Sequence, residues 1–180
     1  MRRLSHQYIK IKPNTCPLRK ESKVRTQDIT FSDHNFGAYC FNASGCKVIY
    51  ANRYNVNDPD SEASPPAPDD YLTRLSASDI ALRNFPGPAI IEWHSKDGAY
   101  HKATIDIEKI FSNGKILHNA NPADIPPNAY IFSPDIIIVV NDRNISVYMK
   151  AHIPLKRPRI PPRPLSNFVD EAVLAFSTDY

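Results

Sequence analysis

The chain has 180 residues, of which 42% are apolar, and this is enough for one domain with a substantial core. It contains 17 prolines and only five glycines, a balance that indicates stiff irregular connections and disfavours glycine-rich phosphate-binding loops. The sequence has no run of 18 apolar residues, so we expect no transmembrane helix.

Charge is unevenly distributed along the chain. Residues 1–25 hold eight basic residues and one acidic residue, a net charge of +7. Residues 26–149 hold nine basic and fifteen acidic residues, a net charge of −6, and residues 150–180 hold five and three, a net charge of +2. We therefore predict a basic, flexible arm over residues 1–27, followed by a single β-rich domain over residues 28–180. The arm is interpreted as a solvated tail, with binding to nucleic acid or lipid headgroups as the alternative.

The first patterned segment lies around two cysteines. Residues 37–42 (GAYCFN) and 46–54 (CKVIYANRY) are predicted to form a hairpin. Cys40 and Cys46 would flank its loop at a spacing that suits a disulfide, which would point to an oxidising compartment, and two buried free thiols are the alternative. Cys16 lies in the basic arm and is expected to be free or absent from a mature form.

A proline-rich acidic loop is predicted next, over residues 55–71 (NVNDPDSEASPPAPDDY). Four prolines indicate a stiff loop, and five carboxylates indicate that it is exposed. Its carboxylates are those of Asp58, Asp60, Glu62, Asp69 and Asp70. A short helix is expected to follow within residues 69–80, with Asp69 or Asp70 at its N-cap.

Residues 89–95 (AIIEWHS) and 99–107 (AYHKATIDI) are predicted to form a second hairpin around the Lys-Asp-Gly turn at residues 96–98. Trp93, the only tryptophan, is interpreted either as a core residue or as an interface anchor near the hairpin tip. One helical turn is expected at residues 107–111.

The segment IIIVVNDRNISVYMKAHI, residues 136–153, has the strongest pattern in the chain. Residues 136–140 form a continuous β-branched run, which is typical of a strand buried on both faces. A turn at residues 141–144 and a return strand complete a third hairpin. The last fifteen residues fit either a helix or a strand, and we expect a final strand from about Val173 that supplies an edge of the sheet.

Together these elements predict a mainly β fold, in which antiparallel hairpins form a sheet or sandwich with Pro-rich loops and one or two short helices.

The search for catalytic chemistry is mostly negative. The sequence contains no motif of a zinc protease, an α/β-hydrolase, a P-loop or a dinucleotide-binding fold. The Ser44-Gly45-Cys46 tripeptide imitates a nucleophile turn, but a hairpin loop explains it better. His94 and His101 could bind a metal together with Asp97, although ordinary cross-strand pairing is the preferred interpretation. We therefore expect no enzymatic activity, no metal and no cofactor.

The order of the segments is similar to that of a known family. FSDHNFGAYCFNASGCKVIYANRY, RNFPGPAIIEWHSKDGAYHKATIDIEKIF, ILHNANPADIP and PDIIIVVNDRNISVYMKA resemble small bacterial proteins found beside type VI secretion effectors. The effectors are mainly of the phospholipase or lipase type, and their small neighbours are immunity proteins. The resemblance covers about residues 28–180 and consists of structural segments without a catalytic signature.

The resemblance implies an immunity protein that binds a cognate effector, a lipase, and occludes its active site. With this function, we predict that the surface contacting the partner contains residues of the acidic loop and of the two turns. These residues are Asp58, Asp60, Asp69, Asp70, Trp93, Asp97, Asp142 and Arg143.

The compartment in which the protein works and the class of its partner each have more than one interpretation. Lipase immunity proteins work in the periplasm, often as lipoproteins, but the sequence as written shows neither a signal peptide nor a lipobox, which would keep the chain in the cytoplasm. The alternative function is a cytoplasmic nucleic-acid or phage-related binding protein that uses the basic arm and residues 150–163. A third interpretation is an unrecognised hydrolase. We expect no nucleic acid as partner, and the oligomeric state stays open.

Overall fold

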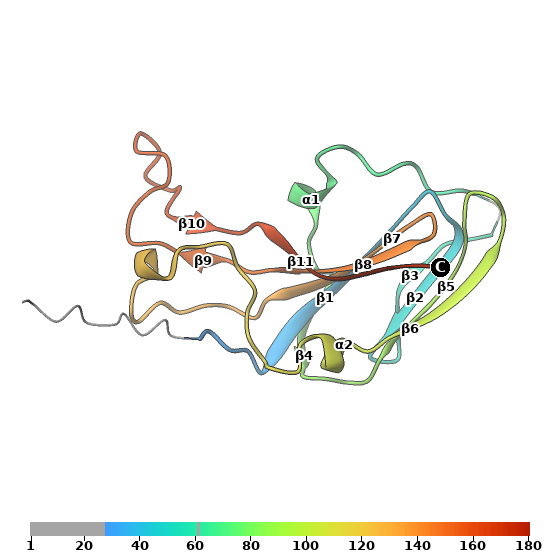
Figure 1. The fold of residues 1–180 in the computed structure, drawn as a ribbon, viewed down its shortest axis with the longest axis horizontal. Coiled ribbons are helices and arrows are strands. Elements are labelled where there is room, and N and C mark those ends of the chain that lie inside the picture. Colours follow the sequence, from blue (N-terminus) through green and yellow to red (C-terminus); the bar gives the residue numbers. More distant parts are fainter. Residues whose placement is uncertain (1–27, 61) are drawn as a thin grey trace, which may run out of the picture.

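The computed structural model describes residues 28–60 and 62–180. The predicted basic arm of residues 1–27, with Cys16, lies outside the described residues. The fold is mainly β with two short α-helices, as predicted (Figure 1). The strands are β1 (Asp33–Phe41), β2 (Ser44–Tyr50), β3 (Arg53–Asn57), β4 (Asp79–Arg83), β5 (Ala89–His94), β6 (Tyr100–Ile105), β7 (Asp135–Asn141), β8 (Asn144–Lys150), β9 (Ile153–Pro154), β10 (Phe168–Val169) and β11 (Ala172–Asp179). The helices are α1 (Tyr71–Arg74), α2 (Ile107–Ile110) and the 3-10 helix η1 (Pro122–Asp124).

Two larger sheets and one small one make up the described part of the fold. The five-stranded sheet has the order β11-β8-β7-β1-β4, and the four-stranded sheet has the order β3-β2-β5-β6. The short strands β9 and β10 pair with each other. The pairings are antiparallel except for that of β1 with β7, which runs parallel from Asn35 and Asp135 to Phe41 and Asn141. The parallel pair joins segments that lie about one hundred residues apart in the sequence.

Strand β7 lies at the centre of the five-stranded sheet, and its apolar run is buried on both faces. Ile136, Ile138 and Val140 belong to the main core, which also contains residues of the four-stranded sheet. Ile137 and Val139 point to the other face and form a smaller cluster with residues that include Leu75 and Tyr148. A strand covered on both faces needs apolar residues at every position, which explains the IIIVV run. The prediction of a doubly buried strand is confirmed.

The prediction of a hairpin from residues 37–42 and 46–54 is wrong. Strand β1 belongs to the five-stranded sheet and β2 to the four-stranded sheet, so the chain crosses between sheets at Asn42 and Ala43. The stretch 46–54 is itself a hairpin, because Ala51 and Asn52 have φ values of 50° and 60° and turn β2 into β3. A strand pattern identifies a strand but not its partner, and an alanine gives no signal of a left-handed turn.

Other local predictions are confirmed. The hairpins β5–β6 and β7–β8 form around the expected turns, and β11 pairs with β8 as an edge strand. Helix α2 is one turn long, and the Asp106 carboxylate accepts a hydrogen bond from the backbone N–H of Lys109 at its start. Asp70 occupies the N-cap position of α1, but its carboxylate binds Arg74 instead of a backbone N–H.

The two larger sheets share one core and are held together by covalent and polar links at both ends of β1. Cys40 and Cys46 form a disulfide, with a Cα–Cα distance of 6.5 Å, across the crossing from β1 to β2. Near the other end, the buried His34 of β1 contacts the hydroxyl of Tyr50 in β2. The sequence did not decide whether these two cysteines are bonded or are free thiols. The structure shows a disulfide, and it joins two sheets instead of the two strands of a hairpin.

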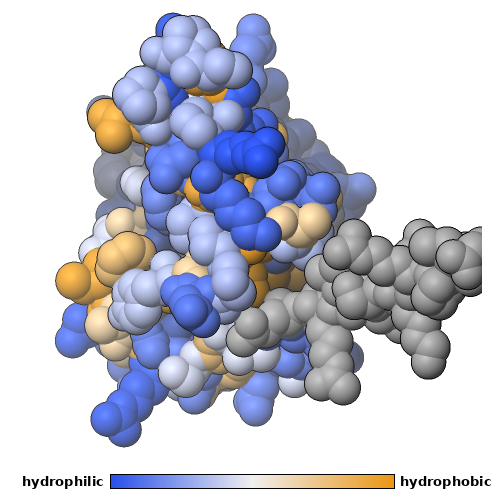
Figure 2. Space-filling model, turned by 90° about the vertical axis from the view of Figure 1, so that its left-hand side faces the viewer, coloured by the Kyte–Doolittle hydropathy of each residue, from blue (hydrophilic) through white to orange (hydrophobic). Residues whose placement is uncertain are grey.

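None of the helices in the described residues is long and apolar enough to cross a membrane. The end of the molecule that carries η1, β9 and β10 has a surface that is largely hydrophilic, with apolar residues gathered at one side and in gaps between the hydrophilic ones (Figure 2).

Candidate functional site

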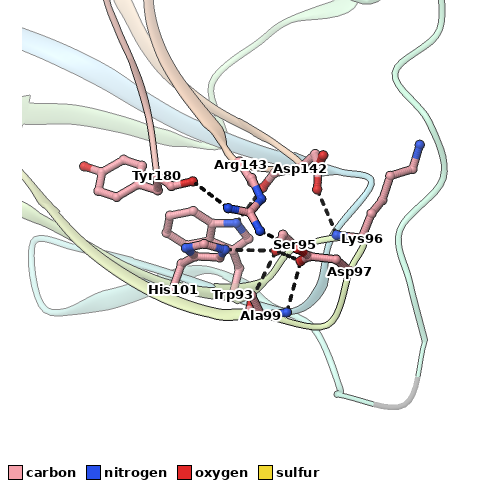
Figure 3. Close-up of polar contacts among 9 residues, drawn as sticks. All are labelled: Trp93, Ser95, Lys96, Asp97, Ala99, His101, Asp142, Arg143 and Tyr180. Carbon is pink, nitrogen blue, oxygen red and sulfur yellow. Dashed lines mark hydrogen bonds and ion pairs between the residues drawn. The ribbon is translucent and has the colours of Figure 1, made fainter.

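The tips of two hairpins from different sheets lie side by side at one end of the molecule (Figure 3). The Asp142 carboxylate, in the β7–β8 turn, accepts a hydrogen bond of 2.8 Å from the backbone N–H of Lys96 in the β5–β6 turn. Asp97 forms an ion pair with Arg143 in the same pair of turns. We call this group the tip cluster and define it as Trp93, Ser95, Lys96, Asp97, His101, Asp142, Arg143 and Tyr180.

Trp93 is the buried centre of the tip cluster. Its side chain is completely buried, and its Nε1–H donates a hydrogen bond of 2.6 Å to the backbone carbonyl of Asp142. Its ring stacks on His101 with a centroid distance of 4.9 Å and meets Tyr180 edge-on at 5.4 Å. The prediction that Trp93 contacts a partner is therefore wrong, because a residue without accessible surface has nothing to offer a partner. Alternation along β5 places it on the same inward face as Ile91.

Ser95, His101 and Asp97 are in hydrogen-bond contact, which invites comparison with a catalytic triad. The Ser95 hydroxyl lies 2.5 Å from the Asp97 Oδ1 and 2.9 Å from the His101 Nε2. An ionised carboxylate can only accept, so the single hydroxyl proton of Ser95 is donated to Asp97. The ring nitrogen of His101 must then donate to the Ser95 oxygen, the opposite of the direction in which a histidine activates a nucleophile.

The Asp97 carboxylate is the hub of this arrangement. It accepts hydrogen bonds from the Ser95 hydroxyl, from the Arg143 guanidinium and from the backbone N–H of Ala99. The bond from Ser95 is the largest influence, followed by that from Arg143, and together they hold the pKa of Asp97 far below its usual range. These contacts hold the β5–β6 turn and its side chains in place, so the tip cluster joins the two hairpins through polar contacts.

The acidic loop starts beside the tip cluster. Ser44 at the start of β2 pairs with Ala63 of the loop and also with His94 at the end of β5. The backbone N–H of Ser64 donates to the carbonyl of Ala43 at 2.7 Å, which holds the loop against the crossing between the sheets. Asp60 is exposed and Asp58 is half-buried on this stretch.

The structure separates the predicted partner-binding residues into two groups. Asp58 and Asp60 lie on the part of the loop that runs beside β2, toward the tip cluster, as the bonds of Ser64 and Ala63 show. Asp69 and Asp70 precede α1, whose neighbour Leu75 packs against the outer face of β7 and β8. Asp70 is also paired with Arg74 at 2.9 Å. The four loop aspartates therefore lie on two different stretches of the loop, and their partner-binding roles stay predictions.

The partner-binding roles of Asp97, Asp142 and Arg143 stay predictions. These residues are brought together, but much of their hydrogen-bonding capacity is used within the tip cluster. About half of the side-chain surface of Arg143 and Asp97 is nevertheless exposed, 49% and 53%. Each therefore keeps a solvent-facing side that a partner could contact.

The metal site considered for His94 and His101 does not form. Trp93 is paired with His101 and His94 with Tyr100, so the two histidines project from opposite faces of the sheet. Among residues 28–60 and 62–180, no group of three or more His, Cys, Asp or Glu side chains is arranged to hold a metal ion. The Ser44-Gly45-Cys46 tripeptide is the start of β2, and its thiol is used in the disulfide.

Sequence reasoning missed one buried polar group. His34 is completely buried; its Nδ1 lies 2.7 Å from the Oδ1 of Asn84, and its Nε2 lies 3.1 Å from the hydroxyl of Tyr50. The amide oxygen only accepts, so Nδ1 carries the proton and Nε2 accepts from Tyr50, which makes the imidazole neutral. Burial lowers the pKa of His34 and raises that of Tyr50. Alternation with the buried Phe36 was the signal in the sequence that could have identified His34 as a core residue.

Several basic residues invoked by the nucleic-acid interpretation are engaged within the protein. Lys150 donates to the carbonyl of Leu75 at 2.9 Å, and Arg159 pairs with Glu171 at 3.0 Å. Part of the charge of residues 150–163 is therefore used for internal contacts. Comparison with protein-family models, with curated proteins and with solved structures finds no match to this chain.

Proposed function

We propose that this protein is an immunity protein that binds a toxic type VI secretion effector, a lipase, and blocks the entry of substrate to the effector's active site. The observation that carries the proposal is the set of contacts at one end of the molecule. There the tip cluster joins the two larger sheets, and hydrogen bonds hold the acidic loop beside it. An interface that is already rigid loses little conformational freedom when it binds, so more of the contact energy appears as affinity.

The charge of this end suits a basic partner. We call it the acidic end surface and define it by Asp58, Asp60, Glu62, Lys96, Asp97, Asp142 and Arg143. It holds five acidic and two basic residues, a net charge of −3. Asp60 and Glu62 are exposed, and the structure shows no ion pair for either within the described residues. Complementary charge speeds the encounter of two proteins and selects between partners.

The division of the loop aspartates supplies a matched experiment. Asp58→Asn with Asp60→Asn removes two charges from the acidic end surface, and Asp69→Asn with Asp70→Asn removes the same number beside α1. We expect the first pair to weaken protection in a co-expression toxicity assay with the proposed cognate lipase effector. Affinity for the purified effector should fall about tenfold or more, the equivalent of about 1.4 kcal/mol. The second pair should leave both unchanged.

Two results would count against the proposal. If both pairs protect as well as the wild type at equal expression, the interface lies elsewhere. If both pairs weaken protection equally, general charge and not the acidic end surface is responsible. Salt-dependent binding of the wild type to DNA would favour the nucleic-acid interpretation instead.

A further inference from the structure

A recess is lined by residues of η1 and of neighbouring segments. This part of the fold, near β9, lies at the opposite end of the molecule from the β5–β6 and β7–β8 turns (Figure 1). The recess has a volume of about 560 Å³, within the size range of small-molecule sites in proteins. Its walls come from three parts of the chain that are distant in sequence: the segment that leads into β1, the Pro-rich loop between α2 and β7, and the residues after β9. Isoleucines and prolines make up half of the lining residues, and Ile29, Ile125 and Ile131 are among them.

The recess is preformed by local hydrogen bonds and by proline. Pro122, Pro126 and Pro127 restrict the loop that forms one wall. The Asn121 side chain accepts a hydrogen bond of 3.0 Å from the backbone N–H of Ala123 and caps η1. These contacts give the wall a fixed shape, so a ligand would meet a site that needs little ordering.

Lys156 connects this wall to the strand β9. Its backbone N–H donates to the carbonyl of Asp124 at 2.8 Å, and its ammonium group donates to the carbonyl of Ala123 at 2.6 Å. An ammonium group has three N–H donors, so two remain for other acceptors. Lys156 is exposed while it also lines the recess, which places its charge at the mouth.

A second polar group in the lining has unused capacity. His118 lines the recess, and its Nδ1 is buried without a hydrogen-bond partner among the described residues. Because this nitrogen has almost no accessible surface, it lies inside the wall and a ligand in the recess does not reach it. The remaining charge, Asp28, already forms an ion pair of 3.0 Å with Lys115.

We propose that this recess binds an amphiphile with one anionic headgroup, of the class of medium-chain carboxylates. The apolar chain lies against the isoleucine and proline walls, and the carboxylate accepts hydrogen bonds from the ammonium group of Lys156. An anion is favoured because Lys156 is the one basic side chain in the lining other than histidine, while the carboxylate of Asp28 is already paired with Lys115. This site is separate from the acidic end surface and does not depend on the proposed function.

Titration calorimetry of the full chain with octanoate tests the proposal. We expect saturable one-to-one binding of octanoate, at least tenfold weaker binding of octanol, and none of octyltrimethylammonium, which reverses the charge of the headgroup. Lys156→Met removes the ammonium group but keeps an unbranched apolar stem, and it should reduce octanoate affinity to that of octanol. Arg157→Met is the matched control, because Arg157 is exposed and does not line the recess; its affinity should stay within twofold of the wild type.

A second variant makes the test independent of charge. Ala129→Trp places a large ring in the recess and should abolish octanoate binding while the circular dichroism spectrum is unchanged. Failure of the full chain to bind octanoate would overturn the proposal. Equal binding of octanol and octanoate, or equal loss in Lys156→Met and Arg157→Met, would overturn it as well.

Discussion

Removal of the disulfide tests how a covalent link between two sheets contributes to stability. Cys40 and Cys46 are six residues apart in the sequence, although in the folded protein they join different sheets. In the chain-entropy description, the stabilisation depends on the loop that is closed in the unfolded chain. For a loop of this length, the relation gives about 2.2 kcal/mol at 25 °C. The short loop, and not the large structure that it joins, should therefore set the magnitude.

Urea unfolding of the oxidised and the reduced protein measures this difference. Trp93 is the only tryptophan and is completely buried, so its fluorescence reports the loss of the core. We expect the reduced protein to be less stable by about 2 kcal/mol, with a lower midpoint in urea. The measurements use a Cys16→Ser background, which prevents disulfides between molecules.

The control is Cys40→Ala with Cys46→Ala, whose stability should not respond to reductant. A difference near zero between oxidised and reduced protein would show that the bond is not formed in solution. A loss above about 4 kcal/mol would refute the reasoning from loop length, because the bond would then be stabilising the contact between the folded sheets directly.

Four further predictions concern single side chains. Trp93→Phe should lower the free energy of unfolding by about 1–3 kcal/mol in urea, because it leaves the half-buried Asp142 carbonyl without its donor. The pKa of Asp97 is lower in the folded than in the unfolded protein, so its contribution to stability is present above about pH 4 and is lost as the pH falls further. In thermal unfolding, the stability of Asp97→Asn should therefore depend less on pH below about pH 4 than that of the wild type. The pKa of His34 is also lowered by burial, so wild-type stability should fall as the pH drops below about 6.5, and His34→Gln should remove that dependence in the same scan. Ile138→Asp places a charge at the centre of β7 and should abolish folding, seen as loss of the far-ultraviolet circular dichroism of the sheet.

Much of the local structure could be predicted because its signals are local. The turn residues at 96–98 and 141–144, with apolar alternation or an apolar run on either side, identified the β5–β6 and β7–β8 hairpins. The partner of β1 could not be predicted in this way. A two-residue connection after β1 is compatible with a hairpin and with a crossing between sheets, and only packing of the whole core decides between them.

The candidate site was predictable in its parts but not in its assembly. The turns at 96–98 and 141–144 were each identified as exposed tips, yet no sequence signal shows that turns of different sheets touch. Trp93 was in principle predictable as a core residue, since it alternates with Ile91 on the inward face of β5. Its position near a turn kept an interface role open as the alternative, and packing against His101 and Tyr180 determined the outcome.

The parallel pairing of β1 with β7 has a consequence for the order in which the protein is made and folded. The strands of the four-stranded sheet all lie within residues 44–105, so their contacts are available early in synthesis. Strand β1 can pair with β4 early, but its other edge must wait for β7, which begins 94 residues after β1 ends. At about 5–20 residues per second, the ribosome needs about 5–20 s to supply that stretch. We therefore expect the four-stranded sheet to form first, while one edge of β1 remains unpaired and open to chaperones until β7 emerges.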